Sequence, residues 1–120
     1  MTGDPLFDKS VFRILVAELG ADDVAELLHV FMADTSDKID ALTQKYADRP
    51  RTKREAHAIK SSAATFGFAE LSGLARDLER CSDATSEAHF EQSVAALRRS
   101  FNATSHFARD HLMRDCMETI

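Results

Sequence analysis

The chain has 120 residues, a length that fits one domain, residues 1–120, with a hydrophobic core of its own. Its formal net charge of −5 argues against a nucleic-acid-binding protein, because such proteins are normally basic. No apolar run approaches the roughly 20 residues that span a bilayer, and the N-terminus does not resemble a signal peptide, so we expect a cytoplasmic protein that does not bind membranes.

Apolar residues recur at helical spacing along most of the chain, and no stretch shows the alternation of a strand. The first predicted helix, residues 8–19, is short and ends at Gly20. A second, longer helix is predicted over residues 22–46. The residues expected on the buried faces of these two helices are Phe12, Leu15, Val16, Leu19, Val24, Leu27, Leu28, Phe31, Ile39, Leu42 and Tyr46.

A third helix is predicted over residues 51–66, and Pro50 suits its first turn. Thr52 and Glu55 can alternatively form a capping box, which leaves the start of this helix open by one turn. The last two helices are predicted over residues 69–81 and 87–117. The residues expected on the buried faces of these three helices are Ala56, Ile59, Ala63, Phe66, Leu71, Leu74, Ala75, Leu78, Phe90, Val94, Leu97, Phe101 and Ala108.

Long amphipathic helices joined by short loops predict the fold class. Four such helices favour an all-α, antiparallel up-down four-helix bundle, and the additional short N-terminal helix is expected to cover one end of it. No repeat, linker or low-complexity segment suggests a second domain. The start at Met1 favours a free-standing chain.

One histidine lies on the outer face of the third predicted helix. At about 100° per residue, His57 is opposite the apolar stripe. The residues that share its face are basic or small: Lys53, Arg54, Lys60, Ser61 and Ala64. Residues 51–80 hold six Lys/Arg against four Asp/Glu, a local charge of +2 in an acidic chain. This open, basic surface suits an imidazole that meets a negatively charged partner.

Ordinary interpretations of the histidines and cysteines compete with a functional one. A lone surface histidine is usually only solvated, and we read His29, His89, His106 and His111 as helix-surface or interfacial residues. Glu26 and His29 form one Glu-x-x-His pair, but a di-iron bundle needs two such pairs, so no metal site is expected. Cys81 and Cys116 form no C-x-x-C pair, and we expect reduced thiols at or near the core.

The segment AHAIKSSAATFGFAELSGLARDLE, residues 56–79, resembles the signature of histidine-containing phosphotransfer (HPt) domains. The pattern covers two of the predicted helices, and the remaining helix lengths and their order are also similar to the family's bundle. The positions that match it are Ala56, His57, Ile59, Lys60, Ser62, Ala63, Phe66, Gly67, Leu71, Leu78 and Glu79.

The resemblance implies a role for three polar residues. His57 would be phosphorylated on Nε2. Lys60 would lie against the phosphoryl oxygens, whose charge of roughly −1.5 to −2 it would offset. Glu79, on the next helix, would orient the imidazole and hold a proton on its other nitrogen.

One departure from the family pattern affects partner docking. Ser61 stands where family members usually have glycine, and its hydroxyl can either crowd a partner or donate to a phosphoryl oxygen. Ser62, by contrast, is expected to point inward and bond back to the preceding turn. The residues expected to contact a docked partner are Lys53, Arg54, Ser61, Ala64 and Gly67.

The implied function is a relay between aspartates of response-regulator receiver domains, with a hybrid or cognate histidine kinase upstream. The protein would be a monomeric phosphoryl carrier without a cofactor of its own, and Mg²⁺ would lie in the receiver's acidic pocket. It carries no nucleotide-binding signature that would make it a kinase. The alternative is a helical interaction module that binds receiver or kinase domains without being phosphorylated.

Overall fold

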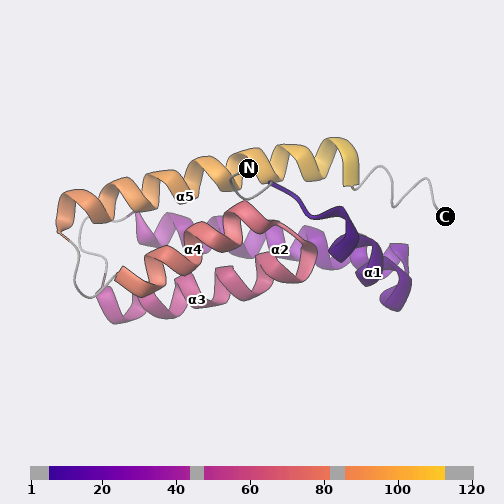
Figure 1. The fold of residues 1–120 in the computed structure, drawn as a ribbon, viewed down its shortest axis with the longest axis horizontal. Helices are drawn as coiled ribbons and strands as arrows, with labels where there is room; N and C mark the ends of the chain where they lie inside the picture. Colours follow the sequence, from indigo (N-terminus) through magenta and orange to yellow (C-terminus); the bar gives the residue numbers. More distant parts are fainter. Residues whose placement is uncertain (1–5, 44–47, 82–85, 113–120) are drawn as a thin grey trace.

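The computed structural model describes residues 6–43, 48–81 and 86–112, and within these ranges the protein is helical and has no strand (Figure 1). A short π-helical segment, η1, continues the last α-helix. The elements in chain order are α1 (Lys9–Leu19), α2 (Ala21–Leu42), α3 (Arg49–Phe66), α4 (Ala69–Cys81), α5 (Glu87–Phe107) and η1 (Ala108–Leu112). The all-α prediction is therefore confirmed.

The helix ends differ from the predictions mainly around the loop before α3. The expected end of the second helix, with Tyr46, lies outside the described residues. Helix α3 begins at Arg49, and Pro50 lies in its first turn as predicted. The capping-box alternative is wrong, because Thr52 is buried inside the helix and its Oγ1 donates to the Asp48 carbonyl at 2.9 Å. The end of the final helix beyond Leu112 is also outside the described residues.

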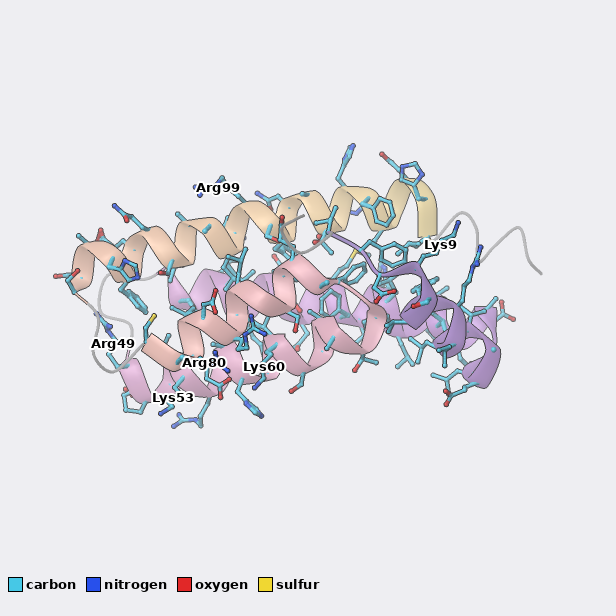
Figure 2. The ribbon with its side chains drawn as sticks, viewed as in Figure 1. Lys9, Arg49, Lys53, Lys60, Arg80 and Arg99 are labelled. Atoms are coloured by element: carbon cyan, nitrogen blue, oxygen red, sulfur yellow. The ribbon has the colours of Figure 1, made fainter. Side chains whose placement is uncertain are left out.

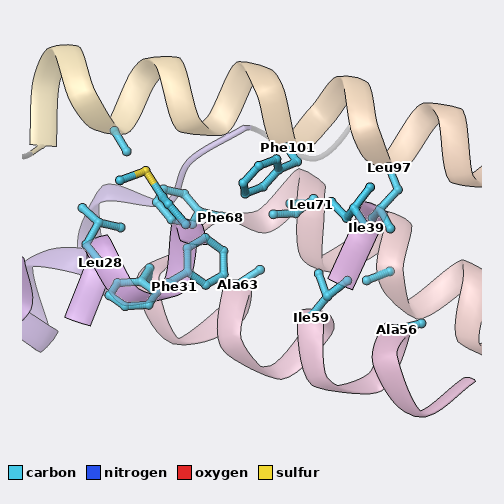
Figure 3. Close-up of a cluster of buried hydrophobic side chains, with 14 of the residues drawn as sticks. Leu28, Phe31, Ile39, Ala56, Ile59, Ala63, Phe68, Leu71, Leu97 and Phe101 are labelled. Atoms are coloured by element: carbon cyan, nitrogen blue, oxygen red, sulfur yellow. The ribbon is translucent and has the colours of Figure 1, made fainter. Parts of the chain in front are cut away.

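The core is formed by apolar side chains from all five α-helices and η1 (Figure 3). The buried face predicted for α3 is confirmed, since its four residues are all at most 5% exposed. Leu15, Val16 and Leu74 are only partly buried at its edge. The other predicted positions that are buried are Phe12, Val24, Leu28, Phe31, Ile39, Leu42, Leu71, Ala75, Leu78, Phe90, Val94, Leu97, Phe101 and Ala108.

Two residues predicted in the core are exposed. Leu19 is 43% exposed and Leu27 is 46% exposed. Leu19 is the last residue of α1, and Leu27 lies about 60° around α2 from the fully buried Val24. Periodicity gives the centre of an apolar face, but the neighbouring helices set how far the covered surface extends.

Each of the four long helices, α2 to α5, packs against two of the other three, and α3 and α4 form the most extensive pair. Helix α2 packs on α3 and α5, α4 packs on α5, and the short α1 contacts α2 and α3. Figure 1 shows α3 and α4 lying side by side beneath α5. The pairing of α3 with α4 determines which side chains meet on their outer surface.

A tight turn at Gly67 joins α3 to α4. Gly67 has a left-handed backbone, with φ of 86°, which glycine adopts without steric cost. The amide of Phe68 donates to the Ala63 carbonyl at 2.9 Å, and this bond closes the end of α3. The Gly67 carbonyl accepts from the Asp8 amide at 2.6 Å, so the start of α1 is attached to the same turn.

Candidate functional site

His57 lies in the middle of α3 on its outer face, with 58% of its side chain exposed. Its Nδ1 is 2.8 Å from Oε2 of Glu79 on α4. An ionised carboxylate only accepts hydrogen bonds, so Nδ1 carries the proton of the neutral ring. Nε2 lies on the other side of the ring and keeps its lone pair, turned away from Glu79.

Glu79 also contacts a cation through its second oxygen. Oε1 is 3.0 Å from Nζ of Lys60, one turn after His57 on α3. The hydrogen bond from Lys60 lowers the pKa of the Glu79 carboxyl, partial desolvation opposes this, and the hydrogen bond from His57 lowers the pKa further. The carboxylate is therefore ionised at neutral pH, and it joins His57 and Lys60 in one network.

A bond between the two helices fixes the register that brings these groups together. The hydroxyl of Ser72 on α4 donates to the Lys60 carbonyl on α3 at 2.9 Å. Glu79 follows Ser72 by seven residues, about two helical turns, so both project from the same face of α4. Sequence reasoning missed Ser72, although its spacing from Glu79 is the signal that would have found it.

The surface next to His57 is hollowed and basic. A groove there is lined by Pro50, Lys53, Arg54, His57 and Glu79. Lys53 and Arg54 are exposed, and Figure 2 shows Lys53 and Lys60 on the part of the molecule formed by α3 and α4. The groove's cations, together with Lys60, favour a negatively charged group near Nε2.

The remaining predicted residues differ in their exposure. Ser61 and Ala64 are exposed on the His57 face of α3. Ser62 donates from Oγ to the Ala58 carbonyl at 2.9 Å, which confirms its predicted bond to the preceding turn. Gly67 was predicted to contact a partner, but it is buried against Asp8. Its left-handed backbone forms the turn between α3 and α4, which explains a glycine at this position.

Comparison with known families decides what kind of domain holds this site. The family model of the Hpt domain matches residues 26–117. The chain belongs to the Hpt domain family. The match includes α3 and α4 with His57, Lys60 and Glu79, and it begins within α2, after α1. No curated protein and no solved structure gives a significant match.

The other histidines of this Hpt domain lie on helix surfaces. His29, His89, His106 and His111 are all exposed. Nε2 of His106 is 3.1 Å from Oδ2 of Asp110, four residues further along the chain. Among the described residues, no three His, Cys, Asp or Glu side chains gather closely enough to hold a metal ion. The described helices also include none with the length and apolar character of a membrane span.

The structure describes one of the two cysteines, Cys81. Cys81, at the end of α4, is a partly buried free thiol, which agrees with the expected reduced cysteine near the core. Cys116 lies outside the described residues.

Proposed function

We propose that this Hpt domain relays a phosphoryl group between aspartates of receiver domains through a phosphohistidine at Nε2 of His57. The observation that carries the proposal is the bond between Nδ1 of His57 and Glu79 at 2.8 Å. It keeps the proton on Nδ1 and leaves a lone pair on Nε2, the nitrogen turned away from Glu79. Membership of the Hpt family supplies the class of reaction, phosphotransfer in a phosphorelay.

The transfer needs a positioned nucleophile on this chain and an activated phosphoryl group on the partner. Nε2 attacks the phosphorus of the receiver's aspartyl phosphate in line, and the P–O bond breaks toward the aspartate carboxylate. The Mg²⁺ that stabilises this step belongs to the receiver's acidic pocket. The contributions of this chain are His57 as acceptor, Glu79 as the residue that orients its ring, and Lys60 as the cation for the phosphoryl oxygens.

The surface around His57 fits a receiver domain in charge and in access. Lys53 and Arg54 line the groove beside the imidazole and face the approach of an acidic pocket. Ser61 and Ala64 are exposed and small, so a partner can come close to the ring. The Ser61 hydroxyl, where the family usually has glycine, would donate to a phosphoryl oxygen or touch the docked receiver.

We further infer that the helices form an antiparallel up-down four-helix bundle made of α2 to α5, within one domain and a monomeric protein. The pairs α2–α3, α3–α4, α4–α5 and α5–α2 all pack together, and this closed ring of contacts supports a four-helix bundle. Helix α1 is then an additional element that contacts α2 and α3.

A phosphotransfer assay with purified receiver domains tests the relay. Each receiver is phosphorylated on its aspartate with radiolabelled phosphate and mixed with the chain. We expect label to move to the Hpt domain in an acid-labile, alkali-stable form and then to a second, unlabelled receiver. Binding of receivers without label on the chain would instead identify the alternative, a helical interaction module.

A further inference from the structure

Glu79 makes two charge-assisted contacts at once, one through each oxygen. Oε2 accepts from Nδ1 of His57 at 2.8 Å, and Oε1 accepts from Nζ of Lys60 at 3.0 Å. The negative charge of one carboxylate is thus shared between a neutral imidazole and an ammonium group. Lys60, the cation proposed for the phosphoryl group, is paired with Glu79 while His57 carries no phosphoryl group.

Phosphorylation of His57 changes the charge on one neighbour of Glu79, the ring, and gives the other, Lys60, a second anion to pair with. A phosphoryl group on Nε2 brings roughly −1.5 to −2 charges and strong acceptor oxygens to the ring. Because Nδ1 keeps its proton, the ring itself becomes positively charged. Lys60 has a flexible four-carbon stem and three N–H donors, and its side chain is 30% exposed, so its ammonium can turn from α4 toward solvent.

We propose that Lys60 exchanges partners during phosphotransfer, from the carboxylate of Glu79 to the oxygens of the phosphoryl group on His57. The proposal rests on the proposed function of His57 as the phosphoryl acceptor. Before transfer, Glu79 is paired with Lys60 and bonded to a neutral ring. After transfer, Glu79 is paired with a positive ring, and Lys60 is paired with the phosphoryl group. In both states every charge lies next to an opposite one.

The exchange allows the ring to react in both directions without losing or gaining a proton. When Nε2 attacks, the new N–P bond uses its lone pair, the bonding pair of the broken P–O bond stays on the aspartate, and the Nδ1 proton stays in place. On onward transfer, the N–P electron pair returns to Nε2, and the ring leaves as neutral imidazole. A ring that had lost its Nδ1 proton would have to leave as an anion, which is a poorer leaving group.

The charged groups around the ring come from two helices. Lys53, Arg54 and Lys60 belong to α3, and Glu79 is the acidic group that α4 contributes. Among them, Lys60 is paired with Glu79, with Nζ 3.0 Å from Oε1. The departure of Lys60 removes a cation that reduces the pull of Glu79 on the Nδ1 proton, at the step in which the ring becomes positive. Glu79 is thus a positioning residue that acts through both His57 and Lys60.

The signals of the lysine Cε groups report this exchange directly. The chain is labelled with ¹³C-lysine and phosphorylated with phosphoramidate, which transfers its phosphoryl group to histidine with loss of ammonia. Spectra are recorded at mildly alkaline pH, where phosphohistidine persists, and ³¹P signals give the extent of phosphorylation. We expect the Lys60 signal to shift in proportion to phosphohistidine. Lys38, which pairs with Asp34 at 2.8 Å on α2, is the matched control and should not shift.

Two variants separate exchange from a mere response to nearby charge. In Glu79→Gln, the resting Lys60 signal should already differ from wild type, and the Nδ1 proton of the phosphorylated ring should be lost at lower pH. In Lys60→Met, the phosphorylated ring should keep its Nδ1 proton at least as well as in wild type, because Glu79 then lacks the competing ammonium of Lys60. An unmoved Lys60 signal in fully phosphorylated wild-type protein would overturn the proposal.

The experiment also distinguishes failure of the exchange from failure of the relay. Phosphoramidate needs no receiver, so it tests the site apart from any docking. A chain that takes label on His57 from receivers but leaves Lys60 unmoved would keep the proposed function and lose the exchange. A chain that shifts Lys60 with phosphoramidate but takes no label from any receiver would keep the exchange and lose the relay.

Discussion

The imidazole of His57 and the carboxylate of Glu79 meet across the α3–α4 interface, with Nδ1 2.8 Å from Oε2. His57 is 58% exposed, yet this bond limits the rotation of its ring, and Glu79 is itself only 20% exposed. An exposed histidine held in one orientation by a partly buried acid differs from an ordinary solvated one. It presents a defined nitrogen to whatever docks on α3.

Replacing the proposed acceptor should remove phosphorylation without unfolding the protein. In His57→Gln we expect no label from any phosphorylated receiver, because no other nucleophilic nitrogen takes the place of Nε2. His57 lies on the surface, and surface substitutions usually change the free energy of unfolding by no more than about 0.5 kcal/mol. Circular dichroism should therefore show unchanged helix content.

The remaining histidines provide the controls for this variant. Single substitutions of His29, His89, His106 and His111, all exposed, should leave labelling of the protein unchanged. Acid-labile label retained on His57→Gln would show that the acceptor lies elsewhere.

Removing the ammonium of Lys60 should affect transfer more than stability. In Lys60→Ala the phosphoryl oxygens lose the cation that we propose for them, and we expect a slower transfer from receiver to His57, by tenfold or more for a charge-assisted bond of about 1.5 kcal/mol or stronger. The ion pair with Glu79 is partly exposed, and such pairs contribute about 0–1 kcal/mol to stability. Stopped-flow transfer and urea unfolding measure the two effects. Normal transfer with a loss of several kcal/mol would mean that Lys60 is structural.

The charge of Glu79 should depend on Lys60. The hydrogen bond from Lys60 is the largest effect lowering the pKa of the Glu79 carboxyl, so this pKa should rise in Lys60→Met. Because the pKa is lowered on folding, the stability that Glu79 adds is present above the pKa of an unfolded glutamate, about 4.3, and is lost as pH falls through the lowered folded value. NMR titration of the Glu79 Cδ in unphosphorylated protein measures both midpoints. Equal midpoints in wild type and variant would show that the ion pair has no effect in solution.

Helical spacing in the sequence predicted which residues share a face with His57 on one helix. The structure added the contacts between side chains of two helices. The face of α3 that holds His57 follows from the 3.6-residue period alone. The meeting of Glu79 with His57 and Lys60 requires the register of α4 against α3, which depends on the Gly67 turn and the bond from Ser72. The spacing of residues within one helix does not predict how two helices are aligned. The role of Glu79 was therefore predicted only from the family resemblance.

The spacing of apolar residues also did not predict where the buried core ends. Leu19 and Leu27 fall in step with buried neighbours but are exposed, because nothing among the described residues covers the side of α1 and α2 on which they lie. Gly67 matched a family position, and we placed it on the docking surface. Its burial against Asp8 follows from where α1 packs, which no local pattern specifies.

The turn between α3 and α4 should be intolerant of a side chain. In Gly67→Ala, φ of 86° alone costs about 1–2 kcal/mol, and the new Cβ would lie 2.5 Å from the Asp8 carbonyl oxygen, so we expect a larger loss of stability. Gly20→Ala is the control, since φ there is 89° but nothing lies within 4 Å of an added Cβ. Thermal unfolding of both variants gives the comparison. A Gly67→Ala effect no larger than that of Gly20→Ala would show that α1 moves aside without cost.

The cations beside His57 should speed docking without taking part in the chemical step. Lys53 and Arg54 line the groove one turn before His57, and charges of this kind attract an acidic receiver pocket over a distance that salt limits to about 8 Å at physiological strength. In the double variant Lys53→Glu, Arg54→Glu we expect weaker receiver binding and slower transfer at low receiver concentration. Saturating receiver should restore most of the rate, because His57, Lys60 and Glu79 are unchanged.

Salt dependence separates this attraction from direct contact with the phosphoryl group. The wild-type transfer rate at low receiver concentration should fall as salt rises, and it should fall more steeply than the rate of the double variant, which has lost the positive charges. The saturated rate should respond weakly to salt in both proteins. If wild type and variant had the same affinity and the same salt dependence, Lys53 and Arg54 would be ordinary solvated residues. Receiver recognition would then depend on the exposed small residues Ser61 and Ala64 beside the ring.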